Sequence, residues 1–371
     1  MTNQKTTSEQ ILSVFVMFSL GSGVILGFYA QTKQDSWICA LLSGILFLPL
    51  MALYLRVIHL YPGLNLFEII FTVFGRLLGS IFSLIYILFA VHLGSMVTNL
   101  FSQYIVAVNM SETPKILIIS LLVMLCVWSI KNGAESIGRI SKMFFPFVSL
   151  IILLTFIVGL KDMDFNYLKP VLQADTKSLL NGAFFYLTLS TGEIFFFLTL
   201  HSSADPNVHM PKIFIKGLVL TVFLLLITNL RNILLLGSPN ALRSSYPSYN
   251  AVSIISVGTF FTRIEVLIGI NMLLAGFIKI CVCLYSANLG LTSLFHIPDQ
   301  KKLAVPCGLL MIAVAGILNS DSPSQIQWLK VFPIYSIPFE FILPVILWIG
   351  AEIRAKMKPA GSQATGLDSS E

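Results

Sequence analysis

Ten apolar runs follow one another along this chain, and they constrain its fold more than any other feature. A membrane core of about 30 Å is crossed by an α-helix of roughly 20 apolar residues, because only such a segment satisfies its own backbone groups. Of the 371 residues, 11% are charged, whereas soluble domains carry about 25%. We predict an all-α polytopic membrane protein with spans at 11–30, 37–58, 80–107, 116–130, 143–160, 180–200, 213–236, 265–290, 303–318 and 331–351.

Lys and Arg residues gather on the cytoplasmic side of membrane proteins and so set the expected orientation. With the N-terminus inside, the inner segments carry 13 of these residues and the outer segments 9, and Lys279 within a span completes the total of 23. We therefore expect both termini to be cytoplasmic, with residues 1–10 as a short N-terminal segment. Residues 352–371 are polar and rich in small side chains, which predicts a disordered cytoplasmic tail.

The connections between spans predict an internal repeat of two halves, residues 11–178 and 179–351. The second connection of each half is long, and the fourth connections, 131–142 and 319–330, have 12 residues each. Five spans per half place the halves in opposite orientations. This is the inverted repeat of many secondary transporters.

The first and sixth spans each contain small residues about ten positions in. These are Gly21-Ser22-Gly23 and Ser190-Thr191-Gly192. Transporters of this kind break their first repeat helices at the membrane midplane, where freed N–H groups suit a carboxylate and freed carbonyls suit an ammonium. We therefore expect a pocket for a zwitterionic amino acid. Close helix packing through glycine is the alternative interpretation.

Three charged residues, Glu193, Lys279 and Glu340, lie near span centres. A central charge is costly, so each must face protein or water. Glu193, beside the second break, is a candidate counter-charge for a ligand amine, a proton carrier, or half of an ion pair. Lys279 suits a pairing role or a cation site filled by its own ammonium, and Glu340, among three prolines, is its most plausible partner.

The third span carries a polar stripe spaced i, i+3, i+7 and i+11, formed by His92, Ser95, Asn99 and Gln103. Such a stripe must face the bundle interior, so Asn99 and Gln103 join the ligand-binding candidates. A hydrogen-bonded structural role is the commoner one for a lone intramembrane histidine, and a proton relay is the alternative.

Motifs typical of enzymes and nucleic-acid-binding proteins are not evident. The sequence contains no phosphate loop, nucleophile triad, metal-ligand cluster or basic nucleic-acid patch. The five cysteines lie in or beside apolar runs without a C-x-x-C pair, which is typical of small buried hydrophobes. We expect no enzyme activity, cofactor, metal site or disulfide.

Motifs along most of the chain carry a family resemblance. They are the Gly21-Ser22-Gly23 segment, LYPGLNLFEI (60–69), SKMFFPF (141–147), NYLKPVL (166–172), GEIFFFL (192–198), FTRIE (261–265) and FIKICVCLYSANLGL (277–291). In these the sequence resembles the integral-membrane B subunit of GerA-type spore germinant receptors, within the amino acid–polyamine–organocation transporter superfamily. Many members continue after the first break with Leu-Pro-Arg, where this chain has Gly27-Phe28-Tyr29.

The resemblance implies a ten-helix fold with broken first and sixth helices, as in LeuT-like transporters. It also implies a small nutrient germinant such as an amino acid, and a complex with A-type and lipoprotein C-type subunits in the spore inner membrane. By that resemblance the pocket is lined by Gly21, Ser22, Gly23, Thr191, Gly192 and Glu193.

The expected function is therefore a nutrient sensor that triggers germination together with partner subunits. A proton-coupled amino acid permease needs the same pocket and is the main alternative. A conduit for water or small ions is a third interpretation, suggested by the polar stripe alone.

Overall fold

The computed structural model describes residues 5–26, 30–108, 110, 112–255, 263–318 and 322–357, and their regular structure is helical throughout apart from a single β-bridge. Short 3₁₀ or π-helical turns separate some of the helices. In chain order the elements are α1 (Ser8–Leu26), η1 (Ala30–Asp35), α2 (Ser36–Leu60), α3 (Leu66–Val108), α4 (Lys115–Lys131), α5 (Ala134–Gly159), η2 (Leu160–Asp162), η3 (Phe165–Leu168), α6 (Thr176–Tyr186), η4 (Leu187–Thr191), η5 (Gly192–Phe196), α7 (Phe197–His201), α8 (Met210–Arg243), α9 (Pro247–Ser253), α10 (Glu265–Leu294), α11 (Lys301–Ile317), α12 (Ser322–Ile337), η6 (Pro338–Ile342) and α13 (Leu343–Met357).

Every predicted span overlaps a helix or a run of consecutive helical segments. Among the described residues, seven helical runs are long and apolar enough to cross a membrane. α4 and α11, in the fourth and ninth predicted spans, are shorter, with 17 residues each. The five cysteines are buried, as predicted.

α3 begins 14 residues before the predicted span, inside what the sequence marks as a loop. The charges of Glu68 and Arg76 interrupt the apolar run there. Asn65 nevertheless starts the helix, because its side chain accepts from the backbone of Glu68 (3.1 Å) while the Glu68 carboxylate accepts from the Asn65 N–H (2.8 Å). The helix then bends at Gly75, whose φ of 73° favours glycine.

The predicted disordered tail from residue 352 requires correction, because α13 continues to Met357. The Glu352 carboxylate forms a two-point ion pair with Arg56 on α2, at 2.5 Å from Nε and 3.1 Å from Nη2. A side-chain contact on its last turns thus extends the helix beyond its apolar part. Residues 358–371 lie outside the described residues.

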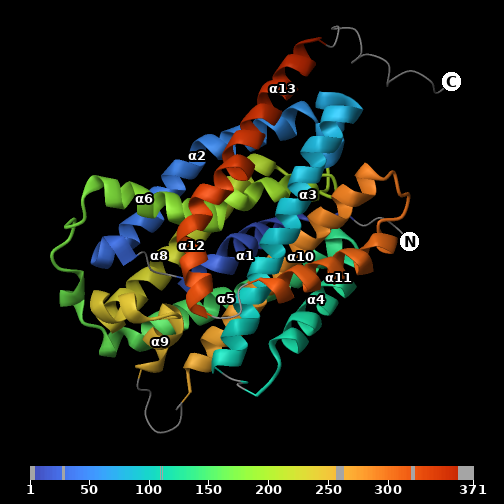
Figure 1. Cartoon of the computed structure of the whole chain (residues 1–371). Helices are drawn as coiled ribbons and strands as arrows, with labels where there is room; N and C mark the ends of the chain where they lie inside the picture. Colours follow the sequence, from blue (N-terminus) through green and yellow to red (C-terminus); the bar gives the residue numbers. More distant parts are fainter. Residues whose placement is uncertain are drawn as a thin grey trace.

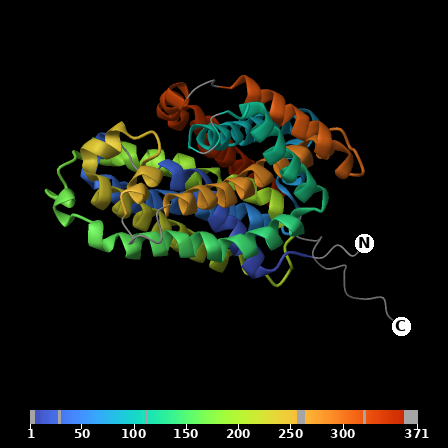
Figure 2. The same cartoon turned by 90° about the horizontal axis from the view of Figure 1, so that it is seen from below.

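α1 and α10 pack against each other in the middle of the molecule (Figure 1). α3, α4 and α11 pack together on one side of this pair, and α2, α6 and α8 on the other (Figures 1 and 2). α5 contacts α1, α8 and α10. α1 also contacts η4 and η5, so two segments far apart in sequence meet near the centre.

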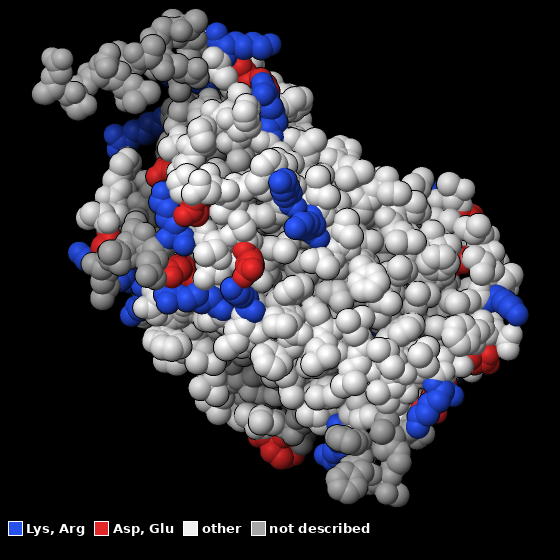
Figure 3. Space-filling view, turned by 180° about the vertical axis from the view of Figure 1, so that it is seen from behind, with Lys and Arg blue, Asp and Glu red and all other residues white. Residues whose placement is uncertain are grey.

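The surface carries the pattern expected of a membrane protein. In Figure 3, Lys, Arg, Asp and Glu gather toward the two ends of the face, and a broad area between them is uncharged. Large apolar side chains point outward from the helices, among them Ile45, Leu121 and Val219, each more than 60% exposed. An apolar belt of this kind is stable against lipid rather than water.

Candidate functional site

The predicted break at Gly21-Ser22-Gly23 is wrong, because α1 is helical through these residues and on to Leu26. The glycines serve close packing instead. A Cβ atom on Gly21 would lie 2.7 Å from Lys279 Cδ, and one on Gly23 would lie 2.6 Å from Leu225 Cδ2. Residues 27–29, where the family commonly has Leu-Pro-Arg, lie outside the described residues.

The run from α6 to α7 does depart from α-helical geometry at the predicted place. After Tyr186 the backbone forms the π-helical turn η4 and then the 3₁₀ turn η5, before α7 resumes at Phe197. Gly192 stands where the first turn gives way to the second. Such irregular turns redirect backbone groups away from the helical ladder and are frequent at functional sites.

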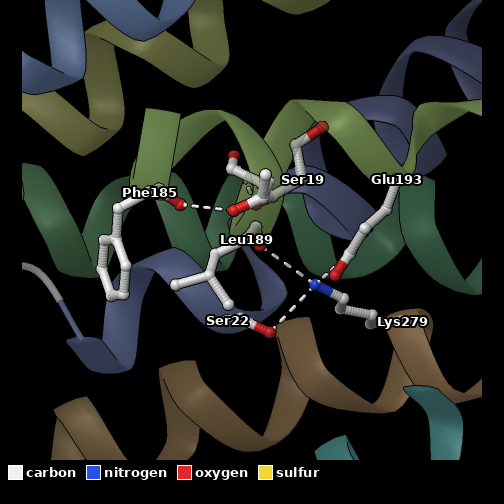
Figure 4. A network of polar contacts seen from close by, with 8 residues as sticks. Ser19, Ser22, Phe185, Leu189, Glu193 and Lys279 are labelled. Carbon is white, nitrogen blue, oxygen red and sulfur yellow. Dashed lines mark hydrogen bonds and ion pairs between the residues drawn. The ribbon is translucent and has the colours of Figure 1, made fainter. Parts of the chain in front are cut away.

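A buried ion pair crosses the centre of the bundle between Lys279 on α10 and Glu193 on η5. Both side chains are fully buried. The Lys279 ammonium also donates to Ser22 Oγ on α1 (2.9 Å) and to the Leu189 carbonyl on η4 (3.2 Å). Figure 4 shows the ammonium among these three groups, so one lysine joins α10, α1 and the irregular helix.

The partner expected for Lys279 was Glu340, and this expectation is wrong. The physical reason is the π-helical turn η6, which contains Glu340 and contacts η5. The Glu340 carboxyl group packs directly against Gly192, in the space that a Cβ atom there would fill. Tyr54 on α2 closes this contact from the other side, donating to the carbonyls of Glu340 (3.3 Å) and Gly192 (3.5 Å).

Further polar contacts fasten the irregular helix to its neighbours. Ser190 Oγ donates to the Ser19 carbonyl on α1 (2.8 Å), and Thr199 Oγ lies 2.9 Å from Ser286 Oγ on α10. The Thr191 hydroxyl is buried and makes no hydrogen bond within the described part of the chain. Among the predicted ligand-binding residues, Thr191 thus offers a hydroxyl group that is available to a ligand.

Outside the predicted span, Asp175 caps the start of α6. The hydrogen bonds of Ser178, first from its side chain and then from its backbone N–H (3.1 Å to Oδ2), hold the pKa of the Asp175 carboxyl group below its usual value. A cap of this kind fixes where α6 begins. It thereby helps to position the irregular turns that follow α6.

Aromatic rings line the other face of η5 and η6. Phe89 on α3 stacks on Phe339 with ring centroids 4.2 Å apart, and on Phe196 at 5.9 Å. His92 lies beside this cluster, with Nδ1 3.0 Å from the Tyr335 hydroxyl. This hydrogen bond matches the structural role expected for a lone intramembrane histidine.

Asn99 and Gln103 were expected to line the ligand pocket, and the structure uses them differently. The Asn99 amide donates to the carbonyls of Ala315 and Leu318 at the end of α11, both at 2.7 Å. Gln103 donates to the Asn99 side chain (2.8 Å). The stripe faces the interior as predicted, but these two side chains hold the end of α11, whose last carbonyls lack helical partners.

Arg231 is one of the nine Lys and Arg residues that the orientation count placed in the outer segments, and the structure places it elsewhere. The residue is fully buried on α8, and its guanidinium donates to Thr155 (2.8 Å) and to the Asn232 side chain (3.0 and 3.2 Å). Its position inside the predicted span 213–236 was the signal that could have identified it.

A hollow of about 880 Å³ opens at the other end of the irregular helix. It lies between the α4–α5 turn, the residues after α7, and α10, and is lined by Trp128, Glu135, Arg139, Ser203, Tyr285 and Lys301. The segment before α1 packs against the residues after α7. Thr6 forms a β-bridge with Ala204, and its carbonyl accepts from the Asp205 N–H (3.0 Å). None of the predicted ligand-binding residues lines this hollow.

The site therefore offers fixed charges, a free hydroxyl and irregular backbone, which suit recognition of a small polar molecule. Within the described ranges, no group of three or more His, Cys, Asp or Glu side chains could hold a metal ion. The arrangement most resembles the substrate region of a transporter with discontinuous helices.

Solved structures show the same fold. The nucleobase-cation-symport-1 family transporter Mhp1, closed with bromovinylhydantoin bound, matches with a TM-score of 0.66 at 12% identity, over 95% of this chain and 91% of its own. A Na⁺-coupled sialic acid symporter in a substrate-bound outward-open state matches with a TM-score of 0.64 at 14% identity, over 94% and 88%. The chain thus has the LeuT-like transporter fold.

The family model described as "Spore germination protein" matches residues 5–322, and the chain belongs to that family. Spore germination protein KB of Bacillus subtilis (strain 168) is 25% identical over 363 residues, covering 96% of this chain and 97% of the relative. The resemblance to spore germinant receptor membrane subunits is confirmed.

Proposed function

We propose that this chain is the membrane subunit of a spore nutrient-germinant receptor that binds a small zwitterion, such as an amino acid, at the Glu193–Lys279 pair. The single observation that carries the proposal is this buried pair beside the η4–η5 irregularity. Its carboxylate and ammonium are the same two groups that an amino acid carries.

A zwitterion entering beside Thr191 would satisfy both members of the pair when they separate. Its ammonium would bind the Glu193 carboxylate, and its carboxylate would accept from Lys279 and from the Thr191 hydroxyl. Each buried charge then keeps a partner of opposite charge. A buried charge without a partner would cost several kcal/mol. Because Lys279 also bonds Ser22 and Leu189, separation of the pair would loosen α1 from the irregular helix and shift the population of helix arrangements.

The architecture proposed with this function is ten membrane-spanning helices in a five-plus-five inverted repeat. The spans and the matched 12-residue connections support it, and so does the transporter fold of the solved neighbours. We place both termini in the cytoplasm and the protein in the spore inner membrane, with A-type and lipoprotein C-type subunits as partners that respond to the helix shift.

A proton-coupled amino acid permease is the second candidate, and the fold shared with substrate-carrying symporters favours it. Uptake of a labelled amino-acid panel into proteoliposomes that hold this chain separates the two. Label that stops at a level stoichiometric with the protein is expected of the sensor. Label that accumulates over many turnovers would show that the chain is a permease and not a sensor.

The Glu193→Gln variant tests the site. We expect it to insert into the membrane and to lose binding of the amino acid retained by the wild type. Glu352→Gln is the matched control, because Glu352 is also ion-paired but lies at the surface end of α13. Equal binding by Glu193→Gln and the wild type would show that the ligand lies elsewhere.

A further inference from the structure

Glu340 is a buried carboxyl group that the proposed ligand site does not use. It lies on η6, is fully buried, and packs against Gly192. Neither of its carboxyl oxygens has a hydrogen-bond partner in suitable geometry among the described residues. The nearby Ser336 hydroxyl, one turn earlier, donates to the Pro333 carbonyl (3.2 Å).

The charges around Glu340 do not balance if it is ionised. The groups that face it are Glu193 on η5, Lys279 on α10 and the Tyr54 hydroxyl on α2. Lys279 forms its ion pair with Glu193, and Tyr54 donates to backbone carbonyls. The cluster therefore contains two carboxyl groups and one ammonium.

Asp35 shows what the chain provides where it buries a carboxylate. That side chain is also fully buried, and its two oxygens accept from the N–H groups of Leu172 and Ala174, both at 2.9 Å. Glu193 likewise has Lys279. The Glu340 carboxyl group has the Ser336 hydroxyl close by, but it has no ion pair and accepts from no backbone N–H within the described residues. A poorly compensated ionised carboxylate in an apolar interior is strongly unfavourable.

We propose that Glu340 is a proton-binding site, and that its carboxyl group carries one proton while it packs against Gly192. The tight contact suits a proton better than any larger cation, because the carboxyl group fills the space beside the glycine. The proton comes from water and binds a carboxylate oxygen, so the cluster holds one positive and one negative charge.

Two π-helical turns lie at this contact and provide a way to release the proton: η6 contains Glu340, and η4 ends directly before Gly192. In η4 and η6 the backbone hydrogen bonds span one residue more than in an α-helix. A shift along either would part Glu340 from Gly192 and admit water. In water at neutral pH a glutamic acid ionises, so the proton would pass to solvent as the contact opens.

Infrared spectroscopy of the full chain in lipid nanodiscs tests the proposal without any ligand. At pH 7 the wild type is expected to show the carbonyl stretch of a protonated carboxylic acid, and Glu340→Gln is expected to lose it. Glu352→Gln is the control and is expected to keep the band. Glutamine is nearly isosteric with protonated glutamic acid, so Glu340→Gln is also expected to unfold at the wild-type temperature.

Absence of the band from the wild type at pH 7 would overturn the proposal. A band that persists unchanged in Glu340→Gln would also overturn it, because the proton would then belong to another carboxyl group. If Glu340→Gln does not fold, Glu340→Asp decides, since it keeps a carboxyl group in the same helix. Its band is expected to persist at a shifted frequency, and an unshifted band would assign the proton to another residue.

Discussion

Lys279 on α10 reaches Glu193 on η5, and with Ser22 and Leu189 around the same ammonium the pair joins three segments of the bundle. Both side chains are fully buried. A buried pair is weak evidence for stability as such, but breaking it by removing one partner leaves an uncompensated charge. Removal of either charge is therefore expected to have a large effect on the stability of the protein.

Replacement of Glu193 by Gln is expected to destabilise the protein by about 3–5 kcal/mol, because Lys279 would remain buried without a carboxylate. Thermal unfolding in detergent measures the loss. The double variant Glu193→Gln/Lys279→Met is expected to recover much of it, since neither charge remains. A double variant no more stable than the single one would contradict the uncompensated-charge explanation.

Gly21 admits the Lys279 side chain to the face of α1. In Gly21→Ala the new Cβ atom would lie 2.7 Å from Lys279 Cδ and 2.9 Å from its Cβ, so the lysine must move. We expect a loss of about 1–3 kcal/mol from overpacking. Gly316→Ala on α11 is the control, because its nearest neighbour would be Ile116 at an ordinary 3.4 Å. Equal stability changes in the two variants would argue against a close approach at Gly21.

Asn99→Ala is expected to separate stability from ligand binding. The variant loses both hydrogen bonds to the end of α11, which predicts a loss of about 1–3 kcal/mol. Amino-acid binding by the folded protein is expected to be unchanged, because these bonds lie away from the Glu193–Lys279 pair. A large drop in amino-acid affinity without a loss of stability would indicate that Asn99 contacts the ligand.

Asp35→Asn is expected to release the loop before α6. A carboxylate that accepts two backbone bonds is replaced by a neutral amide, and hydrogen bonds to charged groups contribute about 1.5–3 kcal/mol each. Amide hydrogen exchange at Leu172 and Ala174 is expected to quicken by about tenfold or more. Asp175→Asn, which alters the cap of α6 only, serves as the comparison, and faster exchange at the same two amides there would contradict the assignment.

The sequence predicted the helical fold and the central charges because both follow from one strong rule, the cost of polar groups in lipid. It could not predict which carboxylate meets Lys279. That choice depends on the π-helical turn at Glu340, which three nearby prolines make possible but do not determine. The role of the glycines in α1 was predicted wrongly because glycine is favoured both where helices pack closely and where a helix breaks.

The hydrophobic pattern also fails where local capping decides the outcome. The Asn65–Glu68 cap starts α3 within an expected loop, and the Arg56–Glu352 contact prolongs α13 into an expected tail. Both depend on pairs of polar side chains. Such pairs give only a weak signal in a sequence whose helices are predicted mainly from the length of its apolar runs.

The ammonium at the centre of this bundle is covalently part of the chain. A cation drawn from solution occupies its site according to its concentration, whereas the occupancy of this one is constant. The junction of α1, α10 and the irregular helix is thereby independent of the salt content of the surroundings. In the proposed receptor, a ligand with charges of its own would therefore be the molecule that competes for this ammonium.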